Sequence, residues 1–114
     1  MTKLYGITNC DTVKKARKWL DNNDIDYEFV DFRKTPLTTA QLKRWADSID
    51  WESLLNKRSR TWRELPDSQK EPLNKTRALS LMQEIPTLIK RPVLDNHGKI
   101  LVGFKDSDYQ SLFQ

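Results

Sequence analysis

Cys10 is the only cysteine in the chain, and it lies where two sequence patterns meet. An apolar strand pattern over residues 3–8 ends just before it, and an amphipathic helix pattern begins just after it. A helix N-terminus carries about half a positive charge and several free backbone N–H groups, which favour a thiolate over a thiol. Lys14, one helical turn further on, adds a cation. The position predicts a nucleophilic thiol, although a lone cysteine can equally be a small buried side chain without chemistry.

The cysteine and histidine content limits the chemistry further. With one cysteine the chain cannot form an internal disulfide, which favours the reducing cytoplasm, where thiols stay free. His97 is the only histidine and lies in a predicted turn over Asn96–Lys99, so we interpret it as a solvated turn residue rather than a catalytic base. One cysteine and one histidine give no metal site.

Charge and hydropathy argue against two classes of partner. The 20 Lys and Arg outnumber the 16 Asp and Glu, for a net charge of +4, which suits an anionic small molecule or an acidic protein surface. The basic residues do not form one long run, so we expect no direct nucleic-acid binding. No segment approaches the ~18 consecutive apolar residues of a membrane span, and no signal peptide precedes the first strand, so we expect no membrane association.

The order of elements predicts an α/β fold. Apolar strand patterns cover residues 3–8 and 25–32 with a helix between them, as in a right-handed βαβ unit with parallel strands. A helical stretch follows, and the chain ends with an antiparallel hairpin and a last helix. This order predicts a thioredoxin-like fold with a four-stranded mixed sheet and a helical insertion between the second and third strands. We expect a single domain over residues 1–114, with its core at about 1–36 and 86–114 and the insert at about 37–85.

Capping and breaking residues predict where several helices begin and end. Expected N-caps are Asp11 or Thr12 for the first helix, Thr38 or Thr39 for the second, and Asp106 or Ser107 for the last. A break is expected at Pro66–Ser68, followed by a helix over 73–82. The side chains of that helix expected near the core are Leu73, Leu79, Leu81, Met82 and the stem of Arg77.

Two residues at predicted strand ends bear on the site. In a thioredoxin-like fold, a proline that opens the third strand comes close to the cysteine in space, often after a cis peptide bond. Pro92, preceded by Arg91, is well placed for that role. Asp31, at the end of the second predicted strand, is interpreted as structural.

Five segments of the chain resemble the ArsC/Spx/YffB family, which is related to arsenate reductases. The resemblance runs nearly from end to end and is greatest to the YffB type. The segments are Asn9–Ala16 around the cysteine, Tyr27–Leu37 with its Thr-Pro turn, the mid-chain arginine loop Leu54–Trp62, the Arg-Pro strand Ile89–Leu94, and Gly103–Lys105.

The resemblance implies roles for individual residues. Cys10 matches the nucleophile, and Arg91 matches the arginine before the strand proline. Arg58 fits the middle arginine of the Spx and YffB pattern, whereas the corresponding arginine of the arsenate reductases falls on Asn56 and their third arginine falls near Lys105. An arginine offers an oxyanion a planar, bidentate fork and a lysine only a point charge, so these departures favour thiol chemistry over arsenate reduction. The implied substrate- or glutathione-binding residues are Lys14, Arg58, Arg91 and Lys105, with Pro92 structural at the site.

The implied function is that of a glutathione-dependent thiol reductase, or arsenate-reductase-like oxidoreductase, with a single nucleophilic cysteine. Val13 stands where Spx-type regulators carry the second cysteine of a Cys-x-x-Cys switch. A mixed disulfide on Cys10 must therefore be resolved by an external thiol, for which glutathione is the expected co-substrate and glutaredoxin a candidate partner. No bound cofactor is expected. The alternative is an Spx-like regulatory protein that binds RNA polymerase or another protein without catalysis.

Overall fold

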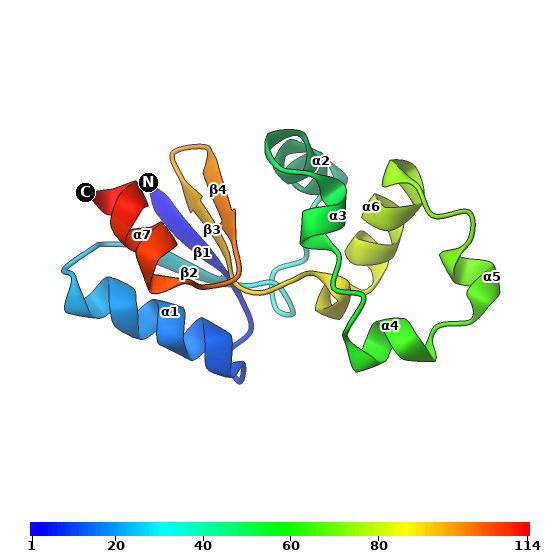
Figure 1. The fold of residues 1–114 in the computed structure, drawn as a ribbon, viewed down its shortest axis with the longest axis horizontal. Helices are drawn as coiled ribbons and strands as arrows, with labels where there is room; N and C mark the ends of the chain where they lie inside the picture. The colour runs from blue at the N-terminus through cyan, green and yellow to red at the C-terminus, as the bar shows by residue number, and fades with distance from the viewer. The chain divides into compact units, whose positions relative to one another are not determined.

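The computed structural model describes all residues, 1–114, and divides the chain into two units (Figure 1). The first, here called the sheet unit, contains Met1–Thr35 and Arg91–Gln114. The second, the helical unit, contains Pro36–Lys90. Cys10 and Arg91 therefore belong to the sheet unit and Arg58 to the helical unit.

Four strands form one mixed sheet in the order β2-β1-β3-β4. The strands are β1 (Thr2–Gly6), β2 (Glu28–Asp31), β3 (Val93–Asn96) and β4 (Lys99–Val102). β1 pairs with β2 in parallel and with β3 antiparallel, and β3 pairs with β4 antiparallel. The predicted parallel first pair, final hairpin and four-stranded mixed sheet are thus confirmed.

The second strand is shorter than the predicted 25–32. β2 has four residues, which pair with Lys3–Gly6 of β1. Before it, Ile25 donates its N–H to the Leu20 carbonyl, which closes the preceding helix rather than extending the sheet. The predicted turn of the hairpin is confirmed, since His97 and Gly98 both have positive φ angles, 53° and 91°.

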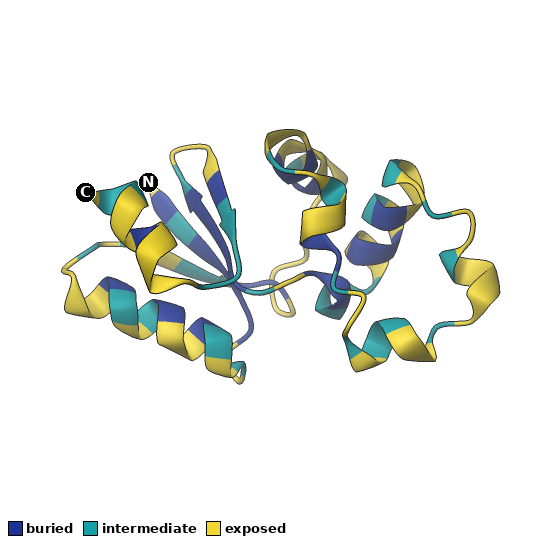
Figure 2. Cartoon of the chain, viewed as in Figure 1, coloured by how far each residue is buried: buried dark blue, intermediate teal, exposed yellow.

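Two helices, α1 (Asp11–Asn22) and α7 (Asp106–Phe113), pack against one face of the sheet (Figures 1 and 2). Their shared core joins β1 and β3 through fully buried side chains: Leu4, Ala16, Leu20, Leu94 and Tyr109. The Tyr109 ring makes edge-on contacts with Trp19, at 5.5 Å between centroids, and with Phe104, at 4.8 Å. Burying a side chain of this size stabilises the fold by roughly 1.5–3 kcal/mol. This core holds α1, and with it the segment around Cys10, firmly on the sheet.

The helical unit is built from short helices around a second core. In order they are α2 (Thr39–Ser48), α3 (Trp51–Leu54), α4 (Arg60–Glu64), α5 (Asp67–Lys70), α6 (Lys75–Glu84) and the 3-10 helix η1 (Pro86–Leu88). The α2 helix contacts both α3 and α6, and its residues Leu42 and Trp45 are fully buried. Every helix of the structure falls short of the length and apolar character that a transmembrane span requires.

Three helix starts show where capping could and could not be predicted. The predicted cap at Thr38 is confirmed, because its hydroxyl accepts the N–H of Gln41. For the first and last helices the prediction was wrong, since the N-caps are Cys10 and Lys105. The expected acidic caps lie one residue further on, at Asp11 and Asp106, inside the first turn, where a negative charge complements the helix dipole.

The middle of the chain also differs from its prediction in two places. The predicted break at Pro66 is confirmed, since α4 ends at Glu64, but Asp67 and Ser68 already belong to α5, whose N-cap is Pro66. The next helix begins at Lys75 rather than at residue 73, since the Asn74 side chain accepts the N–H of Arg77 and caps it there. Ala78 is fully buried in that helix, whereas Arg77 is exposed.

Candidate active site

Cys10 is the N-cap residue of α1 and is partly buried. Its backbone is extended, with φ −107° and ψ 125°, and its carbonyl accepts the N–H of Lys14 at 3.0 Å. The thiol makes no capping hydrogen bond. The sulfur therefore takes no part in holding the helix, and Cys10 lies at the end of α1 where the first-turn N–H groups have no partner within the helix.

The position of this first turn depends on Gly6, the last residue of β1. A Cβ atom built on Gly6 would lie 2.8 Å from Cγ2 of Val13, far inside ordinary contact distance. Val13 is fully buried, so α1 rests its first turn directly on the backbone of β1. Glycine at this position lets the helix start, and therefore Cys10, lie close to the end of the strand.

Arg91 and Pro92 lie at the C-terminal end of β1, the same end of the sheet from which the chain leads to Cys10. Tyr5 is the partner of Val93 in an antiparallel pair, so the chain before Val93 passes the end of β1. The Arg91–Pro92 peptide bond is cis, as expected, and Pro92 is buried. The Pro92 carbonyl accepts the N–H of Gly103 at 2.8 Å, which ties this step to the end of β4.

The two candidate lysines are both exposed and both lie toward this edge. Lys14 is the fourth residue of α1, and its backbone N–H donates to the Cys10 carbonyl. Lys105 is the N-cap of α7, two residues after Gly103, whose φ of +77° turns the chain out of β4. Five of the six predicted site residues belong to the sheet unit, namely Cys10, Lys14, Arg91, Pro92 and Lys105.

Arg58 lies in the helical unit, in the exposed loop between α3 and α4. The backbone of this loop is held by Asn56, whose side-chain oxygen accepts the N–H of Arg58 at 3.1 Å and whose own N–H bonds to the Leu88 carbonyl at 2.8 Å. Ser59 then caps α4 by accepting the N–H of Trp62. The neighbouring Arg60 pairs with Glu64 at 2.7 Å on the surface of α4.

Asp31 lies at the same end of the sheet, and the sequence predicted only a structural role for it. It is the register partner of Gly6 and is only 8% exposed. Its Oδ1 accepts the N–H of Arg33 at 2.9 Å, whereas its Oδ2 is buried without a hydrogen-bond partner. A carboxylate that continues the apolar face of Tyr27 and Phe29 was the available sequence signal.

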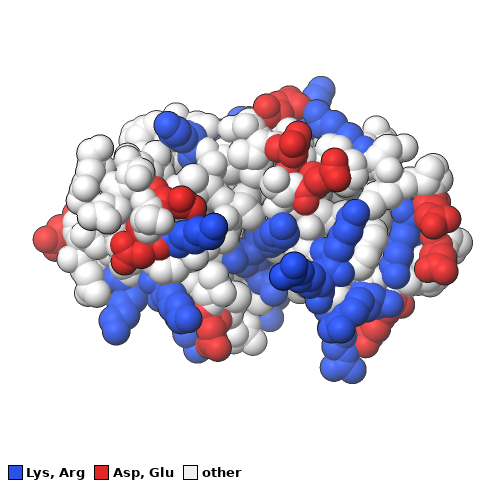
Figure 3. Space-filling view, viewed as in Figure 1, with Lys and Arg blue, Asp and Glu red and all other residues white.

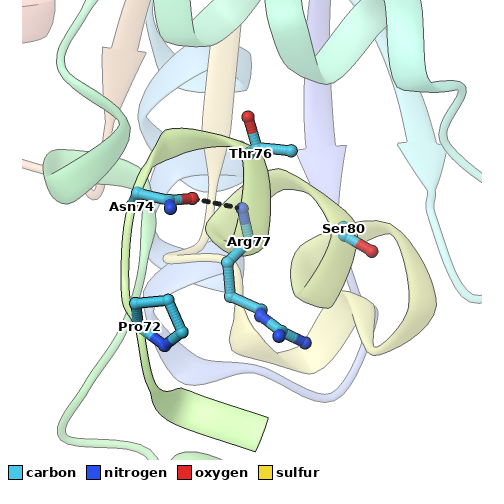
Figure 4. A pocket seen from close by; sticks show the side chains of 5 residues that line it. All are labelled: Pro72, Asn74, Thr76, Arg77 and Ser80. Atoms are coloured by element: carbon cyan, nitrogen blue, oxygen red, sulfur yellow. Dashed lines mark hydrogen bonds between the residues drawn. The ribbon is translucent and has the colours of Figure 1, made fainter.

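The surface hollows of the helical unit involve other residues. One, of about 300 Å³, is lined by Pro72, Asn74, Thr76, Arg77 and Ser80, with the Asn74 cap visible at its rim (Figure 4). Another, of about 430 Å³, lies between α2 and α6. Neither includes a predicted site residue. Lys and Arg side chains are interspersed with acidic ones over the face shown in Figure 3, and no group of three or more potential ligands could hold a metal ion.

Comparison with known proteins decides the family. A model of the ArsC family matches residues 5–112. The chain belongs to the ArsC family. An uncharacterised protein of Haemophilus influenzae is 47% identical to this ArsC-family chain over 113 residues, covering 99% of both.

Solved structures confirm the thioredoxin-like fold of this ArsC-family chain. The structure of a YffB protein matches with a TM-score of 0.95 and 41% identity, covering 97% of each chain. An arsenate-reductase-related protein of Brucella melitensis is 42% identical, with a TM-score of 0.78 over 99% of this chain and 94% of that one. An arsenate reductase of Vibrio cholerae shares the fold alone, at 18% identity and a TM-score of 0.84, over 96% of this chain and 95% of the other.

Regulators are also among the relatives. The global transcriptional regulator Spx of Listeria innocua is 27% identical over 111 residues, which cover 95% of this chain and 83% of that protein. The ArsC family therefore contains relatives named for reduction and relatives named for regulation. The predicted membership of the ArsC/Spx/YffB group is confirmed, and the choice between the two functions must come from the site.

Proposed function

We propose that this protein is a glutathione-dependent thiol reductase of the cytoplasm in which Cys10 is the nucleophile. The observation that carries the proposal is the position of Cys10 as an N-cap whose thiol takes no part in capping. A helix N-terminus is a setting that favours a nucleophilic sulfur, and Lys14 and Arg91 are cations of the same unit. The reducing cytoplasm keeps such a thiol available for reaction.

In the first step, the Cys10 thiolate attacks one sulfur of a disulfide that contains glutathione. A new S–S bond forms between Cys10 and the glutathione sulfur, and the original S–S bond breaks. The other sulfur leaves as a thiolate, and the substrate is thereby reduced. Arg91 would bind a carboxylate of glutathione, for which its guanidinium fork is well suited.

In the second step, an external thiol attacks the glutathione sulfur of the mixed disulfide and releases Cys10 as a thiolate. The chain has no second cysteine, and Val13 is buried beneath Gly6 where a resolving thiol would otherwise stand. A second glutathione, or glutaredoxin, therefore supplies the reducing electrons. The products are oxidised glutathione, or a glutathionylated partner, and free enzyme.

Arsenate is a poorer substrate for this arrangement than a disulfide. Asn56 occupies the place of one expected arginine, and its side chain is engaged by the N–H of Arg58. Lys105 occupies the place of another. The site thus offers fewer bidentate partners for a tetrahedral oxyanion.

The test is mass spectrometry of the intact protein after incubation with oxidised glutathione. We expect one glutathione adduct on Cys10, no adduct in Cys10→Ser, and adduct formation at least several-fold slower in Arg91→Ala, because loss of a charge-assisted hydrogen bond to a carboxylate costs about 1.5–3 kcal/mol. Arg60→Ala, which removes an arginine already paired with Glu64, is the matched control and should leave the rate unchanged. An unmodified Cys10 in the wild-type protein would contradict the proposal.

A second candidate function is regulation through a protein partner. The observation in its favour is the Spx relationship, which covers 95% of this chain. In this alternative, the protein binds RNA polymerase without catalysis, and Cys10 carries no reaction. The single cysteine favours the reductase, since it retains a nucleophile but cannot form the intramolecular switch.

A further inference from the structure

Two pairs of polar side chains join α2 and α6 along one side of the helical unit. The Thr39 hydroxyl donates to Oε1 of Gln83 at 2.7 Å, and Lys75 Nζ donates to Oδ1 of Asp47 at 2.6 Å. The first pair joins the start of α2 to the end of α6, and the second joins the end of α2 to the start of α6. The two helices are therefore antiparallel, and these two outer pairs hold them together at both ends of a shared groove.

The position midway between the outer pairs is occupied by Lys43 on α2 and Leu79 on α6. Each of these residues lies at i,i+4 spacing from an outer pair on either side, so both are on the helix faces that carry the outer pairs. Both side chains line the hollow of about 430 Å³ between the two helices. The middle pair thus combines a charged side chain with an apolar one, whereas both outer pairs combine a donor with an acceptor.

The positive charge of Lys43 is not compensated within this groove. Leu79 is partly buried and has no polar side-chain atom, so it gives the exposed Lys43 no hydrogen-bond or ion-pair partner. The nearby carboxylate of Asp47 is bonded to Lys75 and interacts with Lys43 only through space. With two lysines and one carboxylate, the groove carries one excess positive charge beside an apolar side chain.

The lining of the hollow contains uncharged donors and no acidic side chain. Hydroxyl groups of α6 can donate hydrogen bonds to an anion, and the side chains of Thr76 and Ser80 are seen in Figure 4. Besides Lys43 and Leu79, the lining residues are Thr39, Lys75, Thr76, Ser80 and Gln83. The chemistry of the lining therefore favours a ligand with one negative charge and an apolar part.

The outer pairs also limit the size of the ligand. Thr39 and Asp47 are separated by about two turns of α2, which is about 12 Å along the helix. The hollow between the outer pairs, about 430 Å³, falls in the range of small-molecule pockets. A partner helix would need a groove that continues past both outer pairs, but their side chains cross it. The available space favours a small molecule over a protein segment.

We infer that the α2–α6 hollow binds a small amphipathic carboxylate with an unbranched hydrocarbon chain. The carboxylate accepts a charge-assisted hydrogen bond from Lys43 Nζ, and the chain lies against Leu79 and the aliphatic stems of the lysines. Binding is non-covalent. It uses residues of the helical unit only, so it is a property beyond the proposed reaction of Cys10.

The test is a titration of the isotope-labelled full chain with octanoate, followed by the NMR signals of the backbone amides. We expect saturable shifts in residues of α2 and α6 that line the hollow. Lys43→Gln and Leu79→Gln should each weaken binding by about 3-fold or more, since one removes a partly exposed charge contact and the other an apolar contact. Lys43→Arg keeps the charge and should keep binding.

Matched controls separate the two parts of the interaction. Lys57→Gln removes an exposed lysine from the loop between α3 and α4 and should bind octanoate as the wild type does, and so should Cys10→Ser. Acetate lacks the apolar chain and octanamide lacks the charge, so both should bind more weakly than octanoate. The inference is overturned if octanoate causes no saturable shifts in α2 and α6, if Lys43→Gln binds as the wild type does, or if acetate or octanamide matches octanoate. None of these results would bear on the glutathione adduct of Cys10.

Discussion

Among single residues, Gly6 sets how closely α1 approaches the sheet. Its missing side chain leaves room for Val13, and this contact holds the helix start that Cys10 caps. A change at Gly6 should therefore affect stability and thiol reactivity together. Gly98 has a different role, since its positive φ of 91° serves the hairpin turn and nothing lies within 4 Å of a Cβ built there.

We expect Gly6→Ala to destabilise the protein by about 1–3 kcal/mol, the usual cost of overpacking a filled site. The measurement is urea unfolding of four proteins: wild type, Gly6→Ala, Val13→Ala and the double variant. Because Val13→Ala removes the two methyl groups that would clash, the double variant should be more stable than the sum of the single changes implies. Strict additivity would show that the two residues do not contact each other in solution.

At the scale of elements, α2 and α6 are joined across the helical unit by an ion pair. Lys75 Nζ lies 2.6 Å from Oδ1 of Asp47. The hydrogen bond from Lys75 lowers the pKa of Asp47; desolvation opposes this in part, and the charges of Lys75 and Lys43 lower the pKa further. A carboxylate with a lowered pKa in the folded state stabilises the fold above its unfolded pKa, and this contribution is lost as the pH falls through the folded value.

Lys75→Gln should therefore lower the stability at pH 7, and the difference from the wild type should shrink as the pH is lowered through the acidic range where aspartate titrates. The expected effect is small and decreases with added salt, because both side chains are accessible to solvent. Urea unfolding at a series of pH values measures it. Lys18→Gln, an exposed lysine of α1, is the control. A difference that stayed constant down to pH 2 would rule out the ion pair as its source.

At the scale of the whole molecule, the chain carries Cys10 in one unit and Arg58 in the other, and its relatives include an arsenate-reductase-related protein and a transcriptional regulator. The two functions predict opposite effects of removing the sulfur. A reductase requires Cys10, whereas a regulator without catalysis requires only the surface that its partner recognises.

We expect Cys10→Ser to abolish the reduction of glutathione mixed disulfides, because serine is not a nucleophile toward sulfur under these conditions. The same variant and the wild type, each immobilised, should be tested for binding of purified RNA polymerase of the same organism. On the reductase proposal neither binds the polymerase. Equal and saturable binding by both proteins, with no reductase activity in the wild type, would establish the regulatory alternative instead.

Local patterns account for the parts of this fold that could be predicted. The hairpin turn at Gly98 and the Thr38 cap follow from residues close together in sequence, and the parallel β1–β2 pair follows from the strand–helix–strand order. The N-caps at Cys10 and Lys105 could not be predicted, because the acidic residues beside them are better cap formers and tertiary packing decides which position starts the helix.

The candidate site also contains residues that could be predicted from the sequence and one that could not. Cys10 and the Arg91–Pro92 step were recognisable from residue type and resemblance, since a strand–cysteine–helix junction and a strand-opening proline are local features. The buried oxygen of Asp31 was not, because it depends on which residue of β1 faces the end of β2. That register was unknown while the second strand was expected to span 25–32.

A buried Val13, rather than a second thiol, three residues after Cys10 has a consequence for the proposed reaction with glutathione in a cell. A pair of thiols that closes into one disulfide consumes one oxidised glutathione and releases two reduced ones, so its equilibrium depends on the total glutathione concentration as well as on its redox state. A solitary thiol exchanges one for one. The fraction of Cys10 held as a mixed disulfide would then follow only the ratio of oxidised to reduced glutathione, whatever the size of the pool.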